Sequence, residues 1–467
     1  MASIIEALQQ ALGSDKVISG ENTPDNRRHD YWFVSNLREL QQRGAPRPLC
    51  VVRPANVQDV QQTIKRAGES KTPIIPFGLG SGVCGGIIAD AAGIMLDMSA
   101  MQGTIEIDET NLLATFEAGK NGGEAEEEVA ALGLTMGHWP QSIAVSSVGG
   151  WVATRASGQF STAYGNIEDI LYSVEAVLPN GDIIQAGKAP RAAAGPDLRQ
   201  LLLGSEGTLA VITKVTFSLR RAAKMQAYSA FYAPSMAAGF EVQRQIVQAG
   251  WRPPVMRQYD HPEVGRNFTA FARSEDALII FVHEGPEAFV SVEKTAVAEI
   301  AAAHGLDAAP EKVVAGWLDH RNKVPTWDRF IENKIVVDTI EVSAPWSRID
   351  DVYTAAIASL GKVPGILNAS AHSSHVYRSG INLYFSFAAA VQSEAEMETI
   401  YSACWQRVIE ATAAAGGGIA HHHGIGRVRQ NYLALDLGDT GVSLLKTIKA
   451  ALDPDGIMNP GVLLPHD

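Results

Sequence analysis

Residues 76–86, PFGLGSGVCGG, contain five glycines and follow the apolar run TPII. Glycine has no side chain, so successive backbone N–H groups in such a loop can all face one anion. The segment therefore predicts a strand followed by a phosphate-binding loop. It is not a Walker loop, because no Gly-Lys-Ser/Thr sequence occurs, and Val83 stands where a GxGxxG turn would need its third glycine. Taken alone, the loop is explained equally well as a tight turn without a ligand.

Two further stretches share this polar, glycine-rich character. Residues 137–171, GHWPQSIAVSSVGGWVATRASGQFSTAYGNIEDIL, hold many Gly, Ser and Thr residues with little apolar patterning. They would make a poor core, so we expect their backbone to wrap a polar ligand. Residues 195–213, GPDLRQLLLGSEGTLAVIT, contain another donor-rich turn at 204–208. Three such turns beside short strands predict a large nucleotide with phosphate groups.

The composition narrows the class of protein. Hydrophobic residues make up 46% and charged residues 19% of the 467 residues, which is typical of a globular enzyme with two or three substructures. The net charge of -13 disfavours nucleic acid and anionic membranes as partners. No stretch approaches the ~18 apolar residues of a membrane-spanning helix, and no secretory signal or CxxC pair occurs. We therefore expect a cytoplasmic protein with no nucleic acid partner and no integral membrane segment.

The pattern along the chain predicts an α+β protein in four parts. Residues 1–45 are expected to form an N-terminal helical segment, and residues 46–221 hold the glycine-rich stretches. Residues 222–415 alternate helices and strands without glycine motifs, which indicates a substrate, or cap, domain. Residues 416–467, a C-terminal segment that carries the three adjacent histidines, are expected to return to the domain formed by residues 46–221. Asn180-Gly181 predicts a hairpin with a two-residue turn, and Asp453-Pro454 marks the end of the last helix.

In this order and spacing, the three stretches resemble the FAD-binding domain of the vanillyl-alcohol oxidase/p-cresol methylhydroxylase (PCMH) superfamily. Together with residues 421–429, HHHGIGRVR, they are most similar to alkyldihydroxyacetonephosphate synthase and to bacterial FAD-linked oxidases. The likeness runs from about residue 46 to residue 465. It implies a two-subdomain PCMH-type FAD-binding domain, an α+β cap domain, and FAD as the cofactor.

The resemblance also implies which residues hold FAD. The pyrophosphate would lie on Pro76, Gly78, Gly80, Ser81, Gly82 and Val83. The rest of FAD would be lined by Pro140, Gln141, Ser142, Ser146, Ser147, Gly149, Gly150, Arg155, Ser157, Gly158, Glu206, Gly207, Thr208 and Ile212. Some relatives tether FAD through a histidine in the glycine loop, but this loop has Ser81 beside Gly80, and the counterpart of His138 in the synthases does not bond the cofactor. We therefore expect non-covalent FAD.

Residues 420–429, AHHHGIGRVR, gather three adjacent histidines. On an extended strand neighbouring side chains face opposite sides, so only His421 and His423 would share a face, and a metal would need another ligand from elsewhere. The metal-using relatives, D-lactate and D-2-hydroxyglutarate dehydrogenases, share a His-x-His-x-Gly-Asp-Gly-Asn pattern that this chain lacks. We therefore expect no metal, although a metal site remains the alternative.

Acid–base catalysis is the preferred interpretation of the histidines, because a neutral imidazole exchanges protons readily near pH 7. The resemblance implies that the tract lies beside the flavin. It also matches Tyr384, in SHVYRSGINLYFSFAAA, to the essential tyrosine of the ether-lipid synthases, which makes Tyr384 with His422 or His423 the candidate catalytic pair. Arg257, in PPVMRQYD, matches a family arginine and would hold a substrate anion. Core packing for Tyr384 and a surface salt bridge for Arg257 are the alternatives.

One position departs from the synthases. They have an arginine upstream of their ETSAPW-like stretch, and counting back without a gap from EVSAPW reaches Trp327 here. Arg329 is two residues away. Replacing a cation by an indole would remove phosphate binding and favour an aromatic or apolar substrate.

The sequence therefore predicts a FAD-dependent oxidoreductase, either an oxidase or a dehydrogenase. It would transfer hydride from a hydroxylated small molecule (a hydroxy acid, alcohol or phenol) to flavin N5, and dioxygen or an electron acceptor would reoxidise the flavin. The alternative is a redox-neutral transferase like alkyldihydroxyacetonephosphate synthase. A nucleotide-binding protein without catalysis would leave the tyrosine and histidines unexplained. The oligomeric state is left open by the sequence, with a homodimer among the alternatives.

Overall fold

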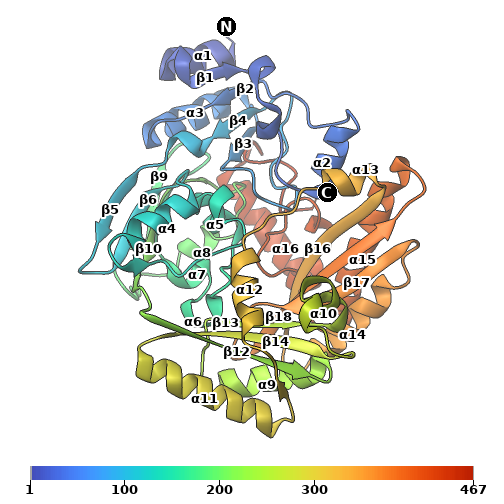
Figure 1. Cartoon of the computed structure of the whole chain (residues 1–467). Helices are drawn as coiled ribbons and strands as arrows, with labels where there is room; N and C mark the ends of the chain where they lie inside the picture. Colours follow the sequence, from blue (N-terminus) through green and yellow to red (C-terminus); the bar gives the residue numbers. More distant parts are fainter. Residues whose placement is uncertain (1–2, 466–467) are drawn as a thin grey trace.

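The computed structural model describes residues 3–465. They form sheets of four, five and seven strands and one two-stranded ribbon, with helices packed around them (Figure 1). The mixture of helices and strands is that of an α+β protein, as predicted.

The first sheet contains the strand that leads into the glycine loop. Its order is β1 (Val17–Ser19), β2 (Cys50–Val52), β4 (Ile94–Asp97), β3 (Ile74–Phe77), with only β1 antiparallel to its neighbour. Helix α3 (Val57–Ser70) joins β2 to β3. It begins at Asn56, whose side chain caps the first turn, and it buries Val60, Ile64 and Ala67 against the sheet at helical spacing. This unit fixes where the loop begins.

The second sheet is antiparallel throughout. Its order is β5 (Thr104–Asp108), β6 (Leu113–Glu117), β10 (Val211–Ser218), β8 (Leu171–Val177), β9 (Ile183–Ala186). The helices around it are α4 (Gly122–Ala130), α5 (Val148–Thr154), α6 (Ser161–Tyr164), α7 (Ile167–Ile170) and α8 (Arg199–Leu202), and β7 (Leu134–Thr135) pairs with β11 (Arg220–Arg221). Residues 137–171 thus form short helices and loops over the sheet, consistent with their weak apolar pattern.

The connection between β8 and β9 corrects the predicted two-residue turn. Val177 pairs with Ile183, so residues 178–182 form the loop. Gly181 has a φ of +83°, but Asn180 does not have a positive φ. The Asn180 side chain instead accepts a hydrogen bond from the Asp182 N–H at 2.9 Å. This local bond stabilises a longer turn, so the hairpin was predicted correctly and its turn type wrongly.

The third sheet forms the cap and is also antiparallel. Its order is β15 (Asp307–Ala308), β12 (Met225–Ala233), β14 (Ala277–Gly285), β13 (Val255–Tyr259), β17 (Ile366–Ser373), β18 (Gly380–Ala390), β16 (Ile335–Pro345). Helices α9 (Met236–Gln248), α11 (Glu287–Ala303), α14 (Ile349–Leu360) and α15 (Met397–Ala414) contribute to the core on one face, and α10 (His261–Asn267) and α12 (Lys312–His320) to the core on the other. The remaining short helix, α13 (Asp328–Glu332), precedes β16.

In the structure, residues 3–45 of the predicted N-terminal segment are divided between two cores. Helix α1 (Ile4–Leu12) packs on the core of the first sheet, and β1 joins the edge of that sheet. Helix α2 (Phe33–Leu40) packs on the cap instead. Trp32 Nε1 donates a hydrogen bond to Tyr401 OH at 2.8 Å, and the Phe33 ring stacks on Tyr401 at 5.4 Å. These apolar side chains complete the cap core, which the helical pattern alone did not reveal.

The C-terminal segment runs back from the cap to the first sheet. Helix α16 (Leu433–Leu452) ends directly before Asp453-Pro454, as predicted, and is drawn in red at the centre of Figure 1. The Ile74 N–H then donates to Ile457 O at 2.7 Å, and the Asn459 N–H donates to Ile74 O at 2.8 Å. The tail therefore lies beside β3.

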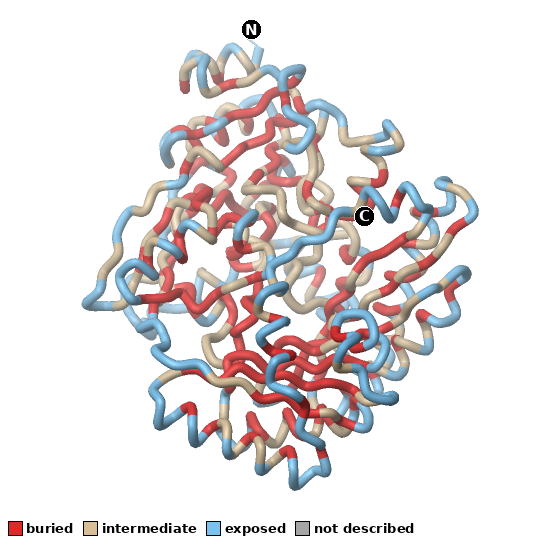
Figure 2. The backbone as a smooth tube through the Cα atoms, in the orientation of Figure 1, coloured by how far each residue is buried: buried red, intermediate tan, exposed pale blue. Residues whose placement is uncertain are grey.

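Burial is concentrated in the three sheets, whereas the outer side of α11 is largely exposed (Figure 2). Among residues 3–465, no helix combines the length and the apolar character needed to cross a bilayer.

Candidate functional site

The loop after β3 presents a row of unpaired backbone donors. Within the described chain, the N–H groups from Leu79 to Gly85 donate no hydrogen bond, whereas the Gly86 N–H donates to Asp30 Oδ2 at 2.8 Å. Gly80 has a φ of +76°, which other residues rarely adopt. The predicted residues in this loop are Gly78, Gly80, Ser81, Gly82 and Val83. Seven adjacent N–H groups without an internal partner fit a pyrophosphate.

The loop touches the start of α5, so the first two glycine-rich stretches meet. A Cβ on Gly78 would lie 2.5 Å from Ser147 Oγ, and Ser147 is the N-cap residue of α5. A Cβ on Gly149 would lie 2.6 Å from the Ala118 side chain. Gly150 completes the cap, because its N–H donates to Ser147 Oγ at 3.2 Å. These predicted residues therefore lie together where one ligand can span both stretches.

Glu206, predicted to line the cofactor, binds the backbone of the histidine segment through its carboxylate. Its carboxylate accepts hydrogen bonds from the Ile425 N–H at 2.7 Å and the Gly426 N–H at 2.9 Å. Burial outweighs these donors and raises the pKa of Glu206 to about 7. Thr208 O accepts a bond from Lys449 Nζ at 2.7 Å. This third stretch thus anchors the histidine segment and α16.

The other predicted cofactor residues have these positions. Pro140 and Ser142 lie in the loop before α5, and Gln141 Nε2 donates to Lys323 O of the cap at 2.5 Å. Ser146 Oγ accepts a hydrogen bond from Trp151 Nε1 at 2.8 Å, and Arg155 ends α5 with a φ of 54°. A Cβ on Gly158 would lie 2.7 Å from Trp139 N, a Cβ on Gly207 would lie 2.8 Å from the Pro76 ring, and Ile212 belongs to the core of the second sheet.

His138 is buried beside the same stretch. Its ring lies 4.7 Å from the Trp151 ring, and neither ring nitrogen has a partner among the described residues. Burial lowers the pKa of His138 to about 3, so the ring is neutral at pH 7. An unpaired polar ring at this point fits a site that receives a polar ligand.

A cavity of about 320 Å³ lies where the second stretch, the β17–β18 turn and the histidine tract meet. Its lining includes Arg155, Ser157, Tyr377, His421 and His422. Two predicted cofactor residues, Arg155 and Ser157, and one predicted catalytic residue, His422, therefore line the same cavity.

The histidines do not alternate along a strand, which corrects the geometry expected from the sequence. Residues 421–423 lie in a bend, so His421 Nδ1 and His422 Nδ1 are 2.7 Å apart. His421 Nε2 is 2.7 Å from Tyr377 OH. His375 lies against both histidine rings and is 2.7 Å from Ser161 Oγ through its Nδ1. Burial lowers the pKa of His421 to about 4 and the pKa values of His375 and His422 well below their usual range.

His375, His421 and His422 each offer one ring nitrogen, and these nitrogens lie within 4.8 Å of one another. Such a trio could hold a divalent cation, with a different set of histidines from the one considered from the sequence. Both nitrogens of His421 are already within hydrogen-bond distance of Tyr377 and His422, so a cation would have to displace one of these contacts. The arrangement as it stands is a hydrogen-bonded network of neutral imidazoles.

Acid is expected to destabilise this network. A buried imidazole whose folded-state pKa is lowered contributes stability that is complete above its unfolded pKa, 6.5, and is lost as the pH falls toward about 4. The thermal midpoint should therefore fall between pH 6.5 and 4, and less steeply in His421→Asn. His304→Asn, at an exposed position after α11, is the control. Equal slopes in wild type and His421→Asn would contradict this account.

Tyr384 lies beside the histidines, as the resemblance implied. On β18 it is paired with Glu341 of β16 and His372 of β17. Its ring centroid is 6.0 Å from that of His422 and 5.7 Å from that of His423. Burial, and then the charge of Glu341, raise the pKa of Tyr384 above its usual value, so the phenol stays protonated at pH 7.

A buried charge network holds His423. His423 Nδ1 is 2.6 Å from Glu341 Oε2, and Arg429 Nη2 is 2.6 Å from Glu341 Oε1. Burial favours the neutral form of Glu341, but Arg429 and His423 outweigh it and lower the pKa of Glu341 to about 2. Arg429 is fully buried, and its Nη1 also donates to Gly424 O at 2.8 Å. The carboxylate therefore lies at the Nδ1 side of His423, without the alignment of a hydrogen bond, and leaves Nε2 for another partner.

Arg257 is a buried cation without an acidic partner. Its Nε donates to Tyr259 OH at 2.7 Å, and its guanidinium lies 5.3 Å from the Trp317 ring. Burial, and then the charge of Arg257, lower the pKa of nearby Arg321, whose Nη1 donates to Gln159 Oε1 at 2.7 Å. Within residues 3–465, no carboxylate oxygen lies within 4.0 Å of either guanidinium. Two such cations favour an anionic ligand.

Trp327 belongs to an aromatic contact between the cap and the N-terminal segment. Its Nε1 donates to Tyr31 O at 3.1 Å, and its ring lies 5.9 Å from the Phe33 ring. Arg329 is exposed on α13. The Trp327 indole thus packs against Phe33 and binds the Tyr31 backbone.

The sequence interpretation missed Glu341, Arg429, His375, Tyr377 and Arg321 as candidate site residues. Arg429 lies inside the histidine motif, at residues 421–429, so the sequence places a cation close to the histidines. Glu341 sits in the middle of an apolar strand, where an acid is expected to have a charged partner. The partner itself follows only from the tertiary fold.

Two family models match most of the chain. Residues 48–187 match the FAD binding domain, and residues 222–463 match the C-terminal domain of FAD linked oxidases. The uncharacterized FAD-linked oxidoreductase YgcU of Escherichia coli (strain K12) is 31% identical, covering 99% of this chain and 98% of that protein. Alkyldihydroxyacetonephosphate synthase of Trypanosoma brucei brucei is 27% identical over 99% of this chain and 80% of that protein. Glycolate oxidase subunit GlcD of Bacillus subtilis (strain 168) is 27% identical over 90% of each chain.

Solved structures share the fold. A crystal structure of alkyldihydroxyacetonephosphate synthase superposes with a TM-score of 0.80 at 24% identity, covering 98% of this chain and 85% of that chain. p-Cresol methylhydroxylase with substrate bound superposes with a TM-score of 0.77 at 18% identity, covering 98% and 95%.

Proposed function

The chain belongs to the FAD-linked oxidase family, and on that premise we propose that it oxidises a hydroxylated small molecule with an anionic group, a hydroxy acid first among the candidates. FAD is its cofactor and supplies a hydride acceptor when bound. The residues we propose to hold it are those of the β3 loop and the start of α5. The observation that supports this function best is His423, with Nδ1 2.6 Å from Glu341 and its ring beside Tyr384.

His423 is the proposed general base. With Nδ1 2.6 Å from Glu341 Oε2, Nε2 is the nitrogen that can take the proton of the substrate hydroxyl. Glu341 is anionic at pH 7, because Arg429 offsets the effect of burial, so it stabilises the imidazolium that forms. His422 has a strongly lowered pKa and no carboxylate partner, which makes it the weaker base.

Tyr384 is the proposed hydrogen-bond donor to the substrate oxygen. The raised pKa keeps its hydroxyl protonated, and Thr339 Oγ1, at 3.1 Å, donates to it and leaves the phenolic proton for another acceptor. Tyr384 and His423 would thus contact the same hydroxyl, one as donor and the other as base.

Arg257 is the proposed anchor for the substrate anion, and Arg321 would assist it. Arg257→Gln is expected to raise KM for an anionic substrate about tenfold or more, because a charge-assisted hydrogen bond contributes about 1.5–3 kcal/mol. Steady-state kinetics separate KM from kcat. A matched Arg407→Gln variant, on the exposed face of α15, should leave both unchanged. An unchanged KM in Arg257→Gln would contradict the anchoring role.

The proposal is tested by anaerobic mixing of the FAD-loaded protein with hydroxy acids, alcohols and phenols. Bleaching of the visible flavin absorption by a hydroxy acid supports it. Bleaching only by uncharged alcohols or phenols would overturn the anion requirement. We also propose non-covalent FAD, so acid precipitation should release the yellow colour into the supernatant.

The second candidate is a redox-neutral transferase. It is supported by the synthase relatives and by the position of Tyr384 beside His422 and His423. Trp327, where a gap-free count expects the synthase arginine, weighs against it. Incorporation of a labelled fatty alcohol into acyl-dihydroxyacetone phosphate, with release of the fatty acid and with no donor able to bleach the flavin, would favour this function over oxidation.

A further inference from the structure

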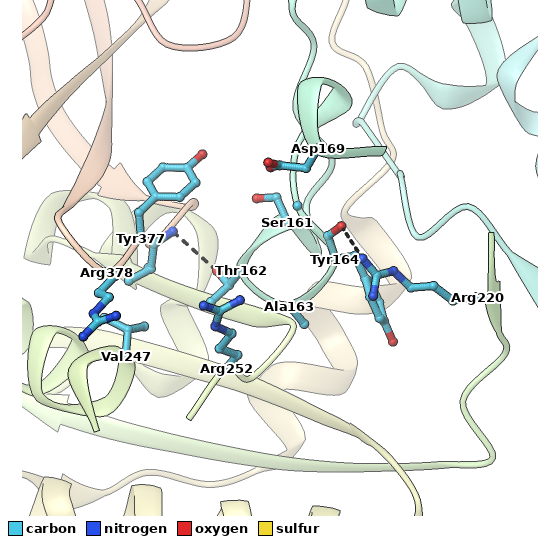
Figure 3. Close-up of a pocket in the computed structure, with 12 residues that line it drawn as sticks. Ser161, Thr162, Ala163, Tyr164, Asp169, Arg220, Val247, Arg252, Tyr377 and Arg378 are labelled. Carbon is cyan, nitrogen blue, oxygen red and sulfur yellow. Dashed lines mark hydrogen bonds between the residues drawn. The ribbon is translucent and has the colours of Figure 1, made fainter. Parts of the chain in front are cut away.

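A second pocket, of about 270 Å³, lies between the FAD-type domain and the cap. Its lining includes three arginines, Arg220, Arg252 and Arg378, together with Thr162 and Tyr377. Figure 3 shows Arg252 and Arg378 on the Tyr377 side of the pocket and Arg220 on the Tyr164 side. The three cations come from separate parts of the chain, which only the fold brings together.

None of these arginines has an acidic partner. Within residues 3–465, no carboxylate oxygen lies within 4.0 Å of any of the three guanidinium groups. Arg220 Nη2 donates to Tyr164 O at 3.0 Å, which satisfies one of its donors. An anion in the pocket would accept charge-assisted hydrogen bonds from these guanidinium groups.

The acids near the pocket are already engaged. Asp169 lines the pocket, and its Oδ2 accepts the Asn166 N–H at 2.9 Å. Glu284, behind Tyr164, accepts a bond from Gln226 Nε2 at 2.6 Å and another from Tyr164 OH. The pocket lining therefore holds three guanidinium groups and one carboxylate, a balance that favours an anionic ligand.

We infer that this pocket binds the terminal phosphate or carboxylate group of a small molecule, at a site separate from Arg257. Guanidinium groups bind both kinds of anion through paired N–H donors. The volume is at the lower end for ligand pockets, so it suits a single anionic group rather than a whole cofactor.

Tyr377 connects this pocket to the histidines. It lines both cavities, and its hydroxyl lies 2.7 Å from His421 Nε2. An anion on the arginines could therefore be the far end of the substrate, or it could belong to a separate metabolite. The chemistry of recognition is the same in the two cases, and kinetics can distinguish them.

Calorimetric titration of the FAD-loaded protein with inorganic phosphate at low ionic strength tests the site without relying on activity. We expect saturable binding that is about tenfold or more weaker in Arg252→Gln/Arg378→Gln, because charge-assisted bonds are lost. Both side chains are exposed, so the fold should tolerate the change. Arg407→Gln should bind phosphate like wild type. No binding to wild type, equal binding in the double variant, or loss only in Arg257→Gln would overturn the inference.

Phosphate inhibition of flavin reduction then identifies the source of the anion. Competition with the hydroxylated donor, with a raised KM and unchanged kcat, supports the far end of the substrate as the natural occupant. A changed kcat at constant KM supports a separate metabolite. This kinetic arm rests on the proposed oxidation, whereas the titration does not, so failure of the oxidase proposal and failure of the anion site are distinguishable.

Discussion

His423→Ala is expected to slow substrate-driven flavin reduction about 100- to 10,000-fold, the usual contribution of a positioned general base. The residue combines an Nδ1 that lies 2.6 Å from an anionic carboxylate with a ring 5.7 Å from the Tyr384 ring. Anaerobic rapid mixing measures the reduction rate directly. The loss should fall on the rate constant and leave the apparent affinity for substrate nearly unchanged, because the hydroxyl proton is transferred only during the reaction.

The controls for this prediction separate chemistry from structure. His422→Ala should have the smaller effect, since no carboxylate orients that ring and burial lowers its pKa. His304→Ala changes an exposed histidine after α11 and should have none. Retention of the wild-type rate by His423→Ala, with loss in His422→Ala, would contradict the assignment of the base.

Arg429→Met is expected to lower the free energy of unfolding by about 3–5 kcal/mol, because it leaves the buried Glu341 carboxylate without its cation. Chemical denaturation of the FAD-loaded protein, followed by tryptophan fluorescence and far-UV circular dichroism together, measures the effect. The pKa of Glu341 is expected to rise at the same time, since the first of the influences that lower it is removed.

A double variant shows whether the loss comes from the unpaired charge. Glu341→Gln/Arg429→Met removes both charges and should regain part of the stability lost in Arg429→Met. It should still reduce flavin slowly, because His423 then lacks its anionic partner. Equal stability of the single and double variants would contradict the charge argument and point to packing of the Arg429 stem instead.

The parts of the site that are local in sequence could be predicted. Glycine-rich composition predicts a loop of this kind, and the loop after β3 has the unpaired backbone N–H donors expected of it. Tyr384 and the histidines were indicated by resemblance, and the structure brings them together. Glu341 and Arg429 are 88 residues apart in sequence and meet only because β16 pairs with β18 in one register while the C-terminal segment returns past them.

The errors have physical causes. Alternating histidine side chains require a strand, but residues 421–423 form a bend, and the N–H groups of Ile425 and Gly426 that follow it are bound by Glu206. The N-terminal 45 residues were treated as one segment because their helical pattern gives no information about which core they join.

The most direct measurement is the rate of anaerobic flavin bleaching by a panel of hydroxy acids and their uncharged alcohol analogues, in wild type and His423→Ala. The account predicts that a hydroxy acid bleaches the wild-type flavin, that its uncharged analogue does so far more slowly, and that His423→Ala is slow with both. A flavin that no hydroxylated donor reduces, in a protein that exchanges a fatty alcohol into acyl-dihydroxyacetone phosphate, would contradict it.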